Sequence, residues 1–438
     1  MTEGFGKIES NFIEDMLLGI SRSKSILLTE VARSSIKGVG IKKASERLSR
    51  QLSKFNSTEF EKNRMDTVIE ILPEHKLFIM DDSEIVKPSA TKMEQLDFVR
   101  DGSDGGKLKL GYHMSEIVCV DKNRQPVSVH SELYSARELH FSSANTITQN
   151  AIKNAPPSGA LTRVPHFLDI KVAKILYGIF CENSEVIKNV VKTCGKGLWV
   201  FDRGFDDGKL FGCMEKLKQK YIIRVKNNRN IFVGNEVHNI DKIARTLKGK
   251  FSFSINFQAG TRENLKASFK QVHLPSMITT PLNMVVVYGF SKDEGKPFYV
   301  LTNLPINNKE ECIQVVRAYL FRWKIEEYFK FKKQCYGFEQ MRVQSLRALK
   351  NLNVILTAVI TFLAILGCSD LHRWIITLAQ PVREKVIFEY YRLLAGLCTL
   401  IQNILLRPQK PPPKSDRHIP KQRDFFYMLR YRKNELGL

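Results

Sequence analysis

Two short apolar runs that each end on an aspartate decide the fold: Lys76-Leu-Phe-Ile-Met-Asp81 and Gly197-Leu-Trp-Val-Phe-Asp202. A continuous apolar run of this length is typical of a buried strand. An aspartate at the end of such a strand projects from a rigid element into the space beyond the sheet. On neighbouring strands, two such carboxylates could hold divalent cations, which prefer hard oxygen ligands. Aspartate also commonly starts a turn, so both interpretations stay open at this point.

Outward from these two runs, the pattern alternates between strand-rich and helix-rich stretches. Residues 1–75, 140–195 and 310–334, and the chain from there to about 405, have the three- and four-residue apolar spacing of helices. Further strands are predicted at residues 117–120, 126–134, 221–225, 251–257, 284–288 and 298–302. The sequence therefore predicts an α/β protein with a helical N-terminal region and a strand-rich stretch near its middle.

The charge of the chain points to a polyanionic partner. The 438 residues carry 68 Lys and Arg against 45 Asp and Glu, a formal net charge of +23. Because 43% of the residues are hydrophobic, the chain can bury a core, which excludes a disordered polyelectrolyte. DNA, RNA and an anionic membrane surface are the candidate partners. The uncharged stretch 351–369 is either a membrane span or, the ordinary explanation, a buried core helix.

One predicted helix, residues 312–335, brings unusual polar residues together. At about 100° per residue, Tyr319, Arg322, Glu326 and Lys333 fall on one stripe about 60° wide. Arg322 and Glu326 could form an ordinary surface ion pair. Alternatively, Glu326 supplies a third carboxylate to a metal site, while Arg322 and Lys333 hold phosphates.

The rest of that helix favours the second alternative. A helix that is apolar on several sides is largely buried, so a charged stripe on it should line a site. The apolar residues that occupy much of the remaining circumference are Trp323, Ile325, Phe329 and Phe331.

These features resemble the insertion-sequence-4 family of DDE transposases. The four polar residues match the family's Y-R-E-K signature, within the segment YLFRWKIEEYFKFKKQ. The segment FIMDDSEI (78–85) is similar to the family's first block and VFDRGFD (200–206) to its second. The resemblance covers about residues 45–400. In the first block Asp81, rather than the adjacent Asp82, has the family's spacing to Ser83.

The resemblance implies a fold and a site. It implies an RNase H-like mixed sheet flanked by helices, interrupted by a β-rich insertion. Asp81, Asp202 and Glu326 would be the catalytic, metal-binding triad for two Mg²⁺ ions, with Mn²⁺ as a substitute. Tyr319, Arg322 and Lys333 would contact DNA near the scissile phosphate.

Five parts of the chain are expected on these grounds. They are a helical DNA-binding region (1–75), the first part of the catalytic core (76–225), the β-rich insertion (226–308), the second part of the core with the Glu326 helix (309–405) and a basic tail (406–438).

The function implied is transposition. The enzyme would cut and rejoin the ends of an insertion sequence, acting on double-stranded DNA (its inverted repeats and the target) as a homodimer. It would be a prokaryotic cytoplasmic protein, nucleoid-associated when bound to DNA and without a membrane role. The alternatives are an inactive or domesticated DNA-binding derivative and an RNase H-like nuclease that cuts without joining.

Overall fold

The computed structural model describes residues 1–34, 40–138, 182–234, 236–257, 261–291, 296–381 and 388–406. Residues 1–399 form one compact unit, and residues 400–438 are a second, of which only 400–406, the end of a helix, is described. The predicted basic tail and the helices predicted between 140 and 181 lie outside the described residues, except for residue 406.

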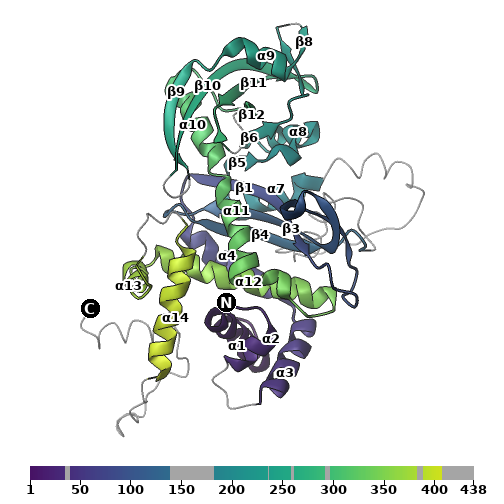
Figure 1. Ribbon diagram of the computed structural model, residues 1–438, viewed down its shortest axis with the longest axis vertical. Coiled ribbons are helices and arrows are strands. Elements are labelled where there is room, and N and C mark those ends of the chain that lie inside the picture. Colours follow the sequence, from purple (N-terminus) through teal and green to yellow (C-terminus); the bar gives the residue numbers. More distant parts are fainter. Residues whose placement is uncertain are drawn as a thin grey trace. The chain divides into compact units, whose positions relative to one another are not determined.

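The helices and strands follow the predicted alternation (Figure 1). The α-helices are α1 (Lys7–Ser23), α2 (Leu28–Arg33), α3 (Ile41–Lys54), α4 (Ser57–Ile71), α7 (Glu182–Cys194), α8 (Gly208–Lys216), α9 (Ile240–Leu247), α10 (Lys309–Leu320), α11 (Trp323–Lys330), α12 (Leu346–Cys368), α13 (His372–Thr377) and α14 (Tyr390–Leu406). Short helical turns are η1 (Gly102–Asp104), η3 (Arg203–Phe205), the π-helical η5 (Phe331–Cys335) and η6 (Phe338–Gln340). The strands are β1 (Lys76–Val86), β2 (Asp97–Asp101), β3 (Lys107–Val120), β4 (Pro126–Tyr134), β5 (Gly197–Phe201), β6 (Lys220–Val225), β7 (Asn230–Val233), β8 (Glu236–Asn239), β9 (Phe251–Phe257), β10 (Thr261–Leu274), β11 (Met277–Tyr288) and β12 (Phe298–Thr302).

Twelve strands of the described residues form one mixed sheet. At its centre, β4, β3 and β1 pair antiparallel, and β5 and β6 continue the sheet parallel to β1. Strand β12 pairs antiparallel with β6 and joins β7–β11 to the same sheet. The predicted α/β class, a mixed sheet flanked by helices, is confirmed. The RNase H-like assignment and the boundaries between the expected parts remain predictions.

The central strands are buried on both faces. Trp199, Val200 and Phe201 are each 0% exposed, although neighbouring side chains of a strand point to opposite faces. This explains the continuous apolar run, which is typical of parallel strands covered by helices on both sides. At the start of β5, a Cβ on Gly197 would lie 2.7 Å from the Phe78 ring, so glycine permits the close approach of β1.

Helix α11 crosses the sheet in contact with β1 and β4, and α12 packs on β4 (Figure 1). By length and composition α12 could span a membrane, but most of its apolar stretch is buried within the protein. Its neighbours include α1, α3 and α4 of the N-terminal region. These contacts account for the uncharged stretch at 351–369 as a core helix.

The predicted single helix over 312–335 is wrong in two places. Its first part, α10, ends at Leu320, and a tight turn follows in which the Arg322 N–H donates to the Tyr319 carbonyl at 2.9 Å. Helix α11 then ends in a π-helical turn, Phe331–Cys335. Apolar periodicity cannot reveal such changes, because they alter the rotation per residue by only tens of degrees.

Candidate active site

The two aspartates lie next to each other because of the parallel pairing between β1 and β5. That pairing ends at the couple formed by Met80 and Phe201. Asp81 and Asp202 are the next residue on each chain, so both follow the last paired position. The prediction that β1 ends at Asp81 is wrong, since the strand continues to Val86 in its pairing with β3. Asp81 is nevertheless the point at which β1 loses its neighbour β5.

Arg322 joins all three predicted acidic residues. Its Nη1 donates to Asp81 Oδ2 at 2.8 Å, and its Nε lies 3.7 Å from Asp202 Oδ1. Its Nη2 donates to Glu326 Oε1. The exposed fraction of the side chain rises from 16% for Arg322 and 18% for Asp81 to 33% for Asp202 and 40% for Glu326. The carboxylates therefore surround one guanidinium, on a site that opens to solvent at Glu326.

The turn between α10 and α11 makes this arrangement possible. Tyr319 lies at the end of α10, where it is buried and its Oη donates to Asp202 Oδ1 at 3.4 Å. In the 3₁₀-like turn after it, the Ile325 N–H donates to the Arg322 carbonyl at 3.1 Å. Glu326 follows in the first turn of α11. Three of the four signature residues thus meet at one place.

Lys333, the fourth signature residue, lies apart from this cluster. It belongs to the π-helical turn, and its Nζ is 3.6 Å from Glu339 Oε1. Glu339 Oε1 also accepts a hydrogen bond from the Val86 backbone N–H, 3.4 Å away. Because the π-helical turn changes the rotation per residue, the angle that a regular α-helix gives Lys333 does not apply there.

Asp82, the alternative first ligand, belongs to the other face of the sheet. Successive residues of a strand alternate between faces, and Asp82 is opposite Ser115 of β3, whereas Asp81 is opposite Glu116. The Asp82 backbone N–H donates to Asp81 Oδ1 at 3.0 Å, and the Asp82 charge helps to raise the pKa of Asp81. The geometry therefore favours Asp81 as the residue that faces Arg322.

Burial dominates the electrostatics of the site. It raises the pKa of Asp81 to about 7; Arg322 opposes this rise, and the nearby Asp202 adds to it. Burial also raises the pKa of Tyr319 to about 12, with Asp202 acting in the same direction. The pKa of Arg322 is raised, because the attraction of Asp202 and the other acids exceeds the opposing effect of burial. The guanidinium is thus firmly cationic in an otherwise acidic site.

The donor set of this site fits hard divalent cations, because carboxylate oxygens are their preferred ligands. Among the residues that the structure describes, however, no group of three acidic, histidine or cysteine side chains is arranged to hold a metal ion. The physical reason lies in Arg322, whose charge occupies the point toward which the three carboxylates converge. A metal ion could bind there only if the guanidinium changed partners.

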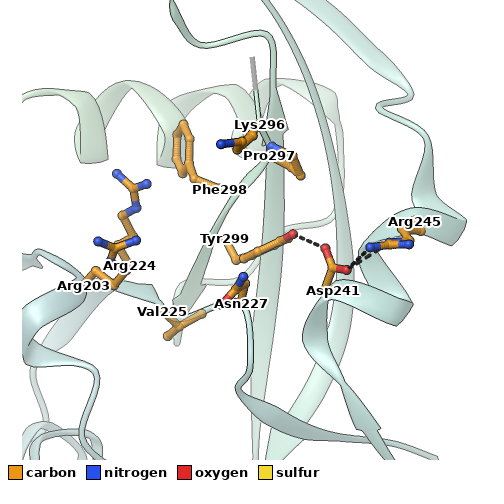
Figure 2. Close-up of a pocket in the computed structure, with 10 residues that line it drawn as sticks. All are labelled: Arg203, Arg224, Val225, Asn227, Asp241, Arg245, Lys296, Pro297, Phe298 and Tyr299. Atoms are coloured by element: carbon orange, nitrogen blue, oxygen red, sulfur yellow. Dashed lines mark hydrogen bonds and ion pairs between the residues drawn. The ribbon is translucent and has the colours of Figure 1, made fainter. Parts of the chain in front are cut away.

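A basic pocket of 370 Å³ lies beside Asp202 (Figure 2). Arg203 and Arg224 line one side of it, and on the other side Arg245 pairs with Asp241 at 2.7 Å. The Phe298 ring also lines the pocket, and its centroid lies 5.3 Å from that of Tyr319. No role was predicted for the residues that line this pocket. The Arg203-Gly-Phe that follows Asp202 was the available signal.

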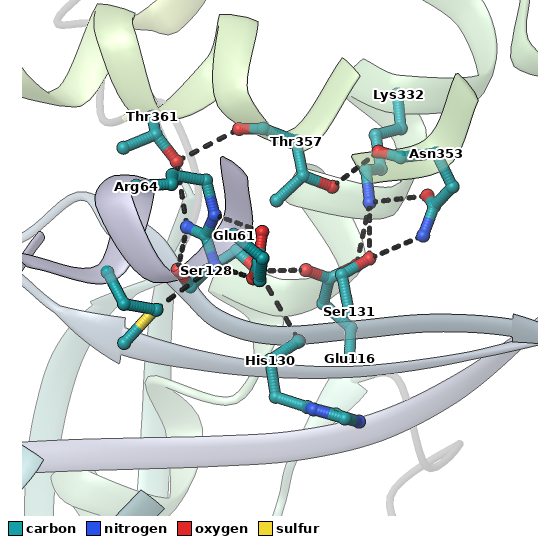
Figure 3. Close-up of polar contacts among 11 residues, drawn as sticks. Glu61, Arg64, Glu116, Ser128, His130, Ser131, Lys332, Asn353, Thr357 and Thr361 are labelled. Carbon is teal, nitrogen blue, oxygen red and sulfur yellow. Dashed lines mark hydrogen bonds and ion pairs between the residues drawn. The ribbon is translucent and has the colours of Figure 1, made fainter. Parts of the chain in front are cut away.

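A second cluster missed from the sequence is buried on the same face of the sheet as Asp81 (Figure 3). Lys332 Nζ lies 2.8 Å from Glu116 Oε2, and both side chains are 0% exposed. Arg64 is also 0% exposed and donates to the Ser128 carbonyl at 2.7 Å and to Glu61. The signal was an acidic residue inside the apolar run of β3, but its partner is 216 residues away in the sequence.

Comparison with known proteins gives a family match and a structural likeness. No curated protein matches the sequence. A cryo-EM structure of the piggyBac transposase synaptic complex with hairpin DNA is similar over 98% of this chain and 81% of that chain, with 10% identity and a TM-score of 0.42. Residues 184–362, which include Asp202 and the whole Y-R-E-K segment, match the family model of the transposase DDE domain. This part of the chain is therefore similar to the DDE domain of transposases.

Proposed function

We propose that this protein is an insertion-sequence-4-type transposase that cuts and rejoins the ends of its element. Asp81, Asp202 and Glu326 would hold two Mg²⁺ ions, or Mn²⁺ in their place. The observation that carries the proposal is the convergence of these three carboxylates on Arg322, from positions far apart in the sequence. A homodimer on double-stranded DNA is the expected active form.

The reaction has two phosphoryl transfers. In the first, water attacks a phosphodiester at the element end, the bond from phosphorus to the 3′ oxygen breaks, and a 3′-hydroxyl and a 5′-phosphate result. In the second, that hydroxyl attacks another phosphodiester, forming one phosphorus–oxygen bond as another breaks. Bound divalent cations would activate the attacking oxygen and stabilise the leaving oxygen.

Arg322 would have different partners in the free and the DNA-bound protein. In the free protein its guanidinium neutralises part of the charge of the three acids. A planar guanidinium also suits two oxygens of a phosphate. When metal ions occupy the carboxylates, Arg322 would turn to the phosphate beside the scissile bond. Tyr319, held against Asp202, would limit where that phosphate lies.

Lys333 would supply a second phosphate contact. Its amine is 22% exposed and its present partner, Glu339, is 38% exposed, so the pair is open to solvent. Exchange of that weak ion pair for a DNA phosphate costs little. Lys333 lies on the side of Glu326 away from Tyr319 in the chain, so together the two contacts would bracket the scissile bond.

The basic pocket beside Asp202 would bind the DNA backbone next to the reacting phosphate. Its cationic lining includes Arg203, Arg224 and Lys296. Each neutralised phosphate contributes to affinity through counterion release, so binding should weaken steeply with salt. Arg224→Ala should therefore reduce both the affinity for DNA and the salt dependence of binding, without abolishing cleavage.

The decisive experiment is cleavage of DNA that carries the element's inverted repeats, with Mg²⁺, by the wild type and by Asp81→Asn, Asp202→Asn and Glu326→Gln. Each substitution is nearly isosteric, and each should reduce the rate by three or more orders of magnitude. Asp82→Asn is the matched control and should cleave normally. Undiminished cleavage by one of the three variants would remove that residue from the triad.

The same reactions separate the proposed function from its alternatives. Joined products between an element end and target DNA identify a transposase. Cleavage without joined products identifies a nuclease. Binding of the inverted repeats without cleavage, by the wild type with Mg²⁺ or Mn²⁺, identifies an inactive derivative.

A further inference from the structure

The buried pair formed by Lys332 and Glu116 links the two halves of the candidate active site. Glu116 lies directly opposite Asp81 on the neighbouring strand, so both side chains are on the same face of the sheet. Lys332 belongs to the π-helical turn that continues the helix of Glu326. The ion pair therefore connects Glu116, which is opposite Asp81, to the helical segment that carries Glu326.

Every hydrogen-bonding position of the Lys332 ammonium has a partner (Figure 3). In addition to Glu116, its Nζ donates to Ser131 Oγ at 3.0 Å and to Asn353 Oδ1 at 3.1 Å. Glu116 in turn accepts hydrogen bonds from the hydroxyls of Ser128 and Ser131. Strands β3 and β4, helix α12 and the π-helical turn thus meet at one ammonium group.

A buried ion pair of this kind is not explained by stability. Apolar side chains of similar volume often stabilise a core as well or better, because desolvation of two charges is costly. What the pair does supply is a specific contact between the helical segment and strand β3, because the loss of either partner leaves a charge buried and unpaired. The contact is made from the π-helical turn itself.

The direction of the next side chain, Lys333, depends on this contact, because Lys332 and Lys333 are consecutive residues of the same turn. Lys332 points into the core, and Lys333 then points to Glu339, beside the end of β1. If the turn became a regular α-helix, Lys333 would rotate relative to Glu326. If α11 lost this contact with strand β3, Glu326 would shift relative to Asp81.

We propose that Lys332 and Glu116 are a positioning pair: their buried contact fixes the π-helical turn on strand β3 and so sets Glu326 and Lys333 in register with Asp81. The catalytic consequence rests on the function proposed above, whereas the positioning itself rests on geometry alone. Neither residue contacts the reacting atoms.

The first test measures the exposure of Lys333 without DNA or metal. Lysines of the folded protein are acetylated briefly, and cleavage after glutamate releases residues 328–339 as one peptide with both Lys330 and Lys333. Lys330, which is 52% exposed, is the internal reference. The ratio of Lys333 to Lys330 acetylation should rise several-fold in Lys332→Met/Glu116→Gln, which removes both charges and avoids an unpaired one.

Arg64→Met is the matched control for general loosening. Arg64 is an equally buried cation on the same sheet face, but its hydrogen bonds go to α4, β4 and Thr361 of α12. Its acetylation ratio should equal that of the wild type. An unchanged ratio in the double variant, or an equal rise in Arg64→Met, would overturn the proposal.

The second test is a mutant cycle on cleavage of the inverted repeats. Lys332→Met/Glu116→Gln should lower kcat about tenfold to a hundredfold, the cost of a misplacement of about 1 Å. Adding Lys333→Ala to that variant should cost much less than Lys333→Ala costs alone, because Lys333 is already displaced. Additive losses would overturn the catalytic role. Absence of cleavage by the wild type would contradict the proposed function instead, and the acetylation ratios would still decide the positioning.

Discussion

Two charged clusters lie one strand apart on the same face of the sheet, and they are built on opposite principles. Around Arg322, three carboxylates surround one guanidinium, partly exposed, which leaves two negative charges uncompensated when all are ionised. Around Lys332, the two acids Glu61 and Glu116 are matched by two bases, and Lys332, Arg64 and Glu116 are 0% exposed. The exposed, unbalanced cluster, with its excess negative charge, can attract a cationic ligand. The buried, balanced cluster has no net charge, and Lys332, Arg64 and Glu116 have no access to solvent, so its charges can only hold elements of the protein in place.

Breaking the balanced cluster should have the largest effect on stability. Lys332→Met leaves Glu116 buried without its cation, which should lower the free energy of unfolding by about 3–5 kcal/mol. The double variant Lys332→Met/Glu116→Gln should recover most of that loss. Urea denaturation of the two variants measures the difference, and equal stabilities would show that the cluster is not balanced by this pair.

The unbalanced cluster should respond to pH in the opposite sense to an ordinary paired aspartate. Because burial raises the pKa of Asp81 to about 7, the folded protein binds its proton more tightly than the unfolded chain does. Stability should therefore fall as pH rises from about 4 to 7. Asp81→Asn lacks this loss, so without metal it should gain roughly 2–4 kcal/mol on the wild type between pH 4 and pH 8.

Thermal denaturation of both proteins across this pH range, with chelator present, checks that expectation. The gain should disappear when saturating Mn²⁺ stabilises the wild type. A stability difference independent of pH would mean that Asp81 ionises in the folded protein as it does in the unfolded chain.

Removing the guanidinium of Arg322 should increase the affinity of the exposed cluster for metal ions. Arg322→Ala frees the three carboxylates, so the affinity for Mn²⁺ in the absence of DNA should rise about tenfold, equivalent to about 1.4 kcal/mol. Electron paramagnetic resonance of free Mn²⁺ measures this directly. Arg64→Ala is the control and should leave the affinity unchanged. A lower affinity in Arg322→Ala would show that the arginine supports the metal site rather than competing for it.

An ion pair outside both clusters should have the smallest effect on the stability of the protein. Lys188 and Glu185 of α7 lie 2.7 Å apart, with exposed fractions of 45% and 38%. Glu185→Gln should change the free energy of unfolding by no more than about 0.5 kcal/mol. A loss comparable to that of Lys332→Met would remove the distinction drawn between balanced, buried charges and solvent-exposed ones.

The strands and the residues of the exposed cluster could be predicted from the sequence, because each is marked by a short local pattern of residues. The predicted strands at 126–134, 251–257 and 298–302 agree with β4, β9 and β12, and Asp81, Asp202 and Glu326 converge. The balanced cluster has no such signature. Glu116 and Lys332 become partners only through the pairing of β1 with β3 and the position of α11, which no local pattern encodes.

The geometry of the helix was predictable only in part. Spacing placed Tyr319, Arg322 and Glu326 together, as the structure does, whereas Lys333 pairs with Glu339. The difference comes from the tight turn before Trp323 and the π-helical turn after Lys330, which side-chain packing imposes on a sequence with ordinary helix formers.

The parallel pairing of β1 with β5 has a consequence for folding. Residue 76 pairs with residue 197, and the guanidinium that joins both aspartates is at position 322. Contacts so distant in sequence form slowly, because closing a long loop costs conformational entropy before the contacts that stabilise it can form. The acidic site therefore forms late, when synthesis has passed residue 326. A chain still short of residue 322 has the two aspartates but neither the third acid nor the cation, so its acidic site is incomplete.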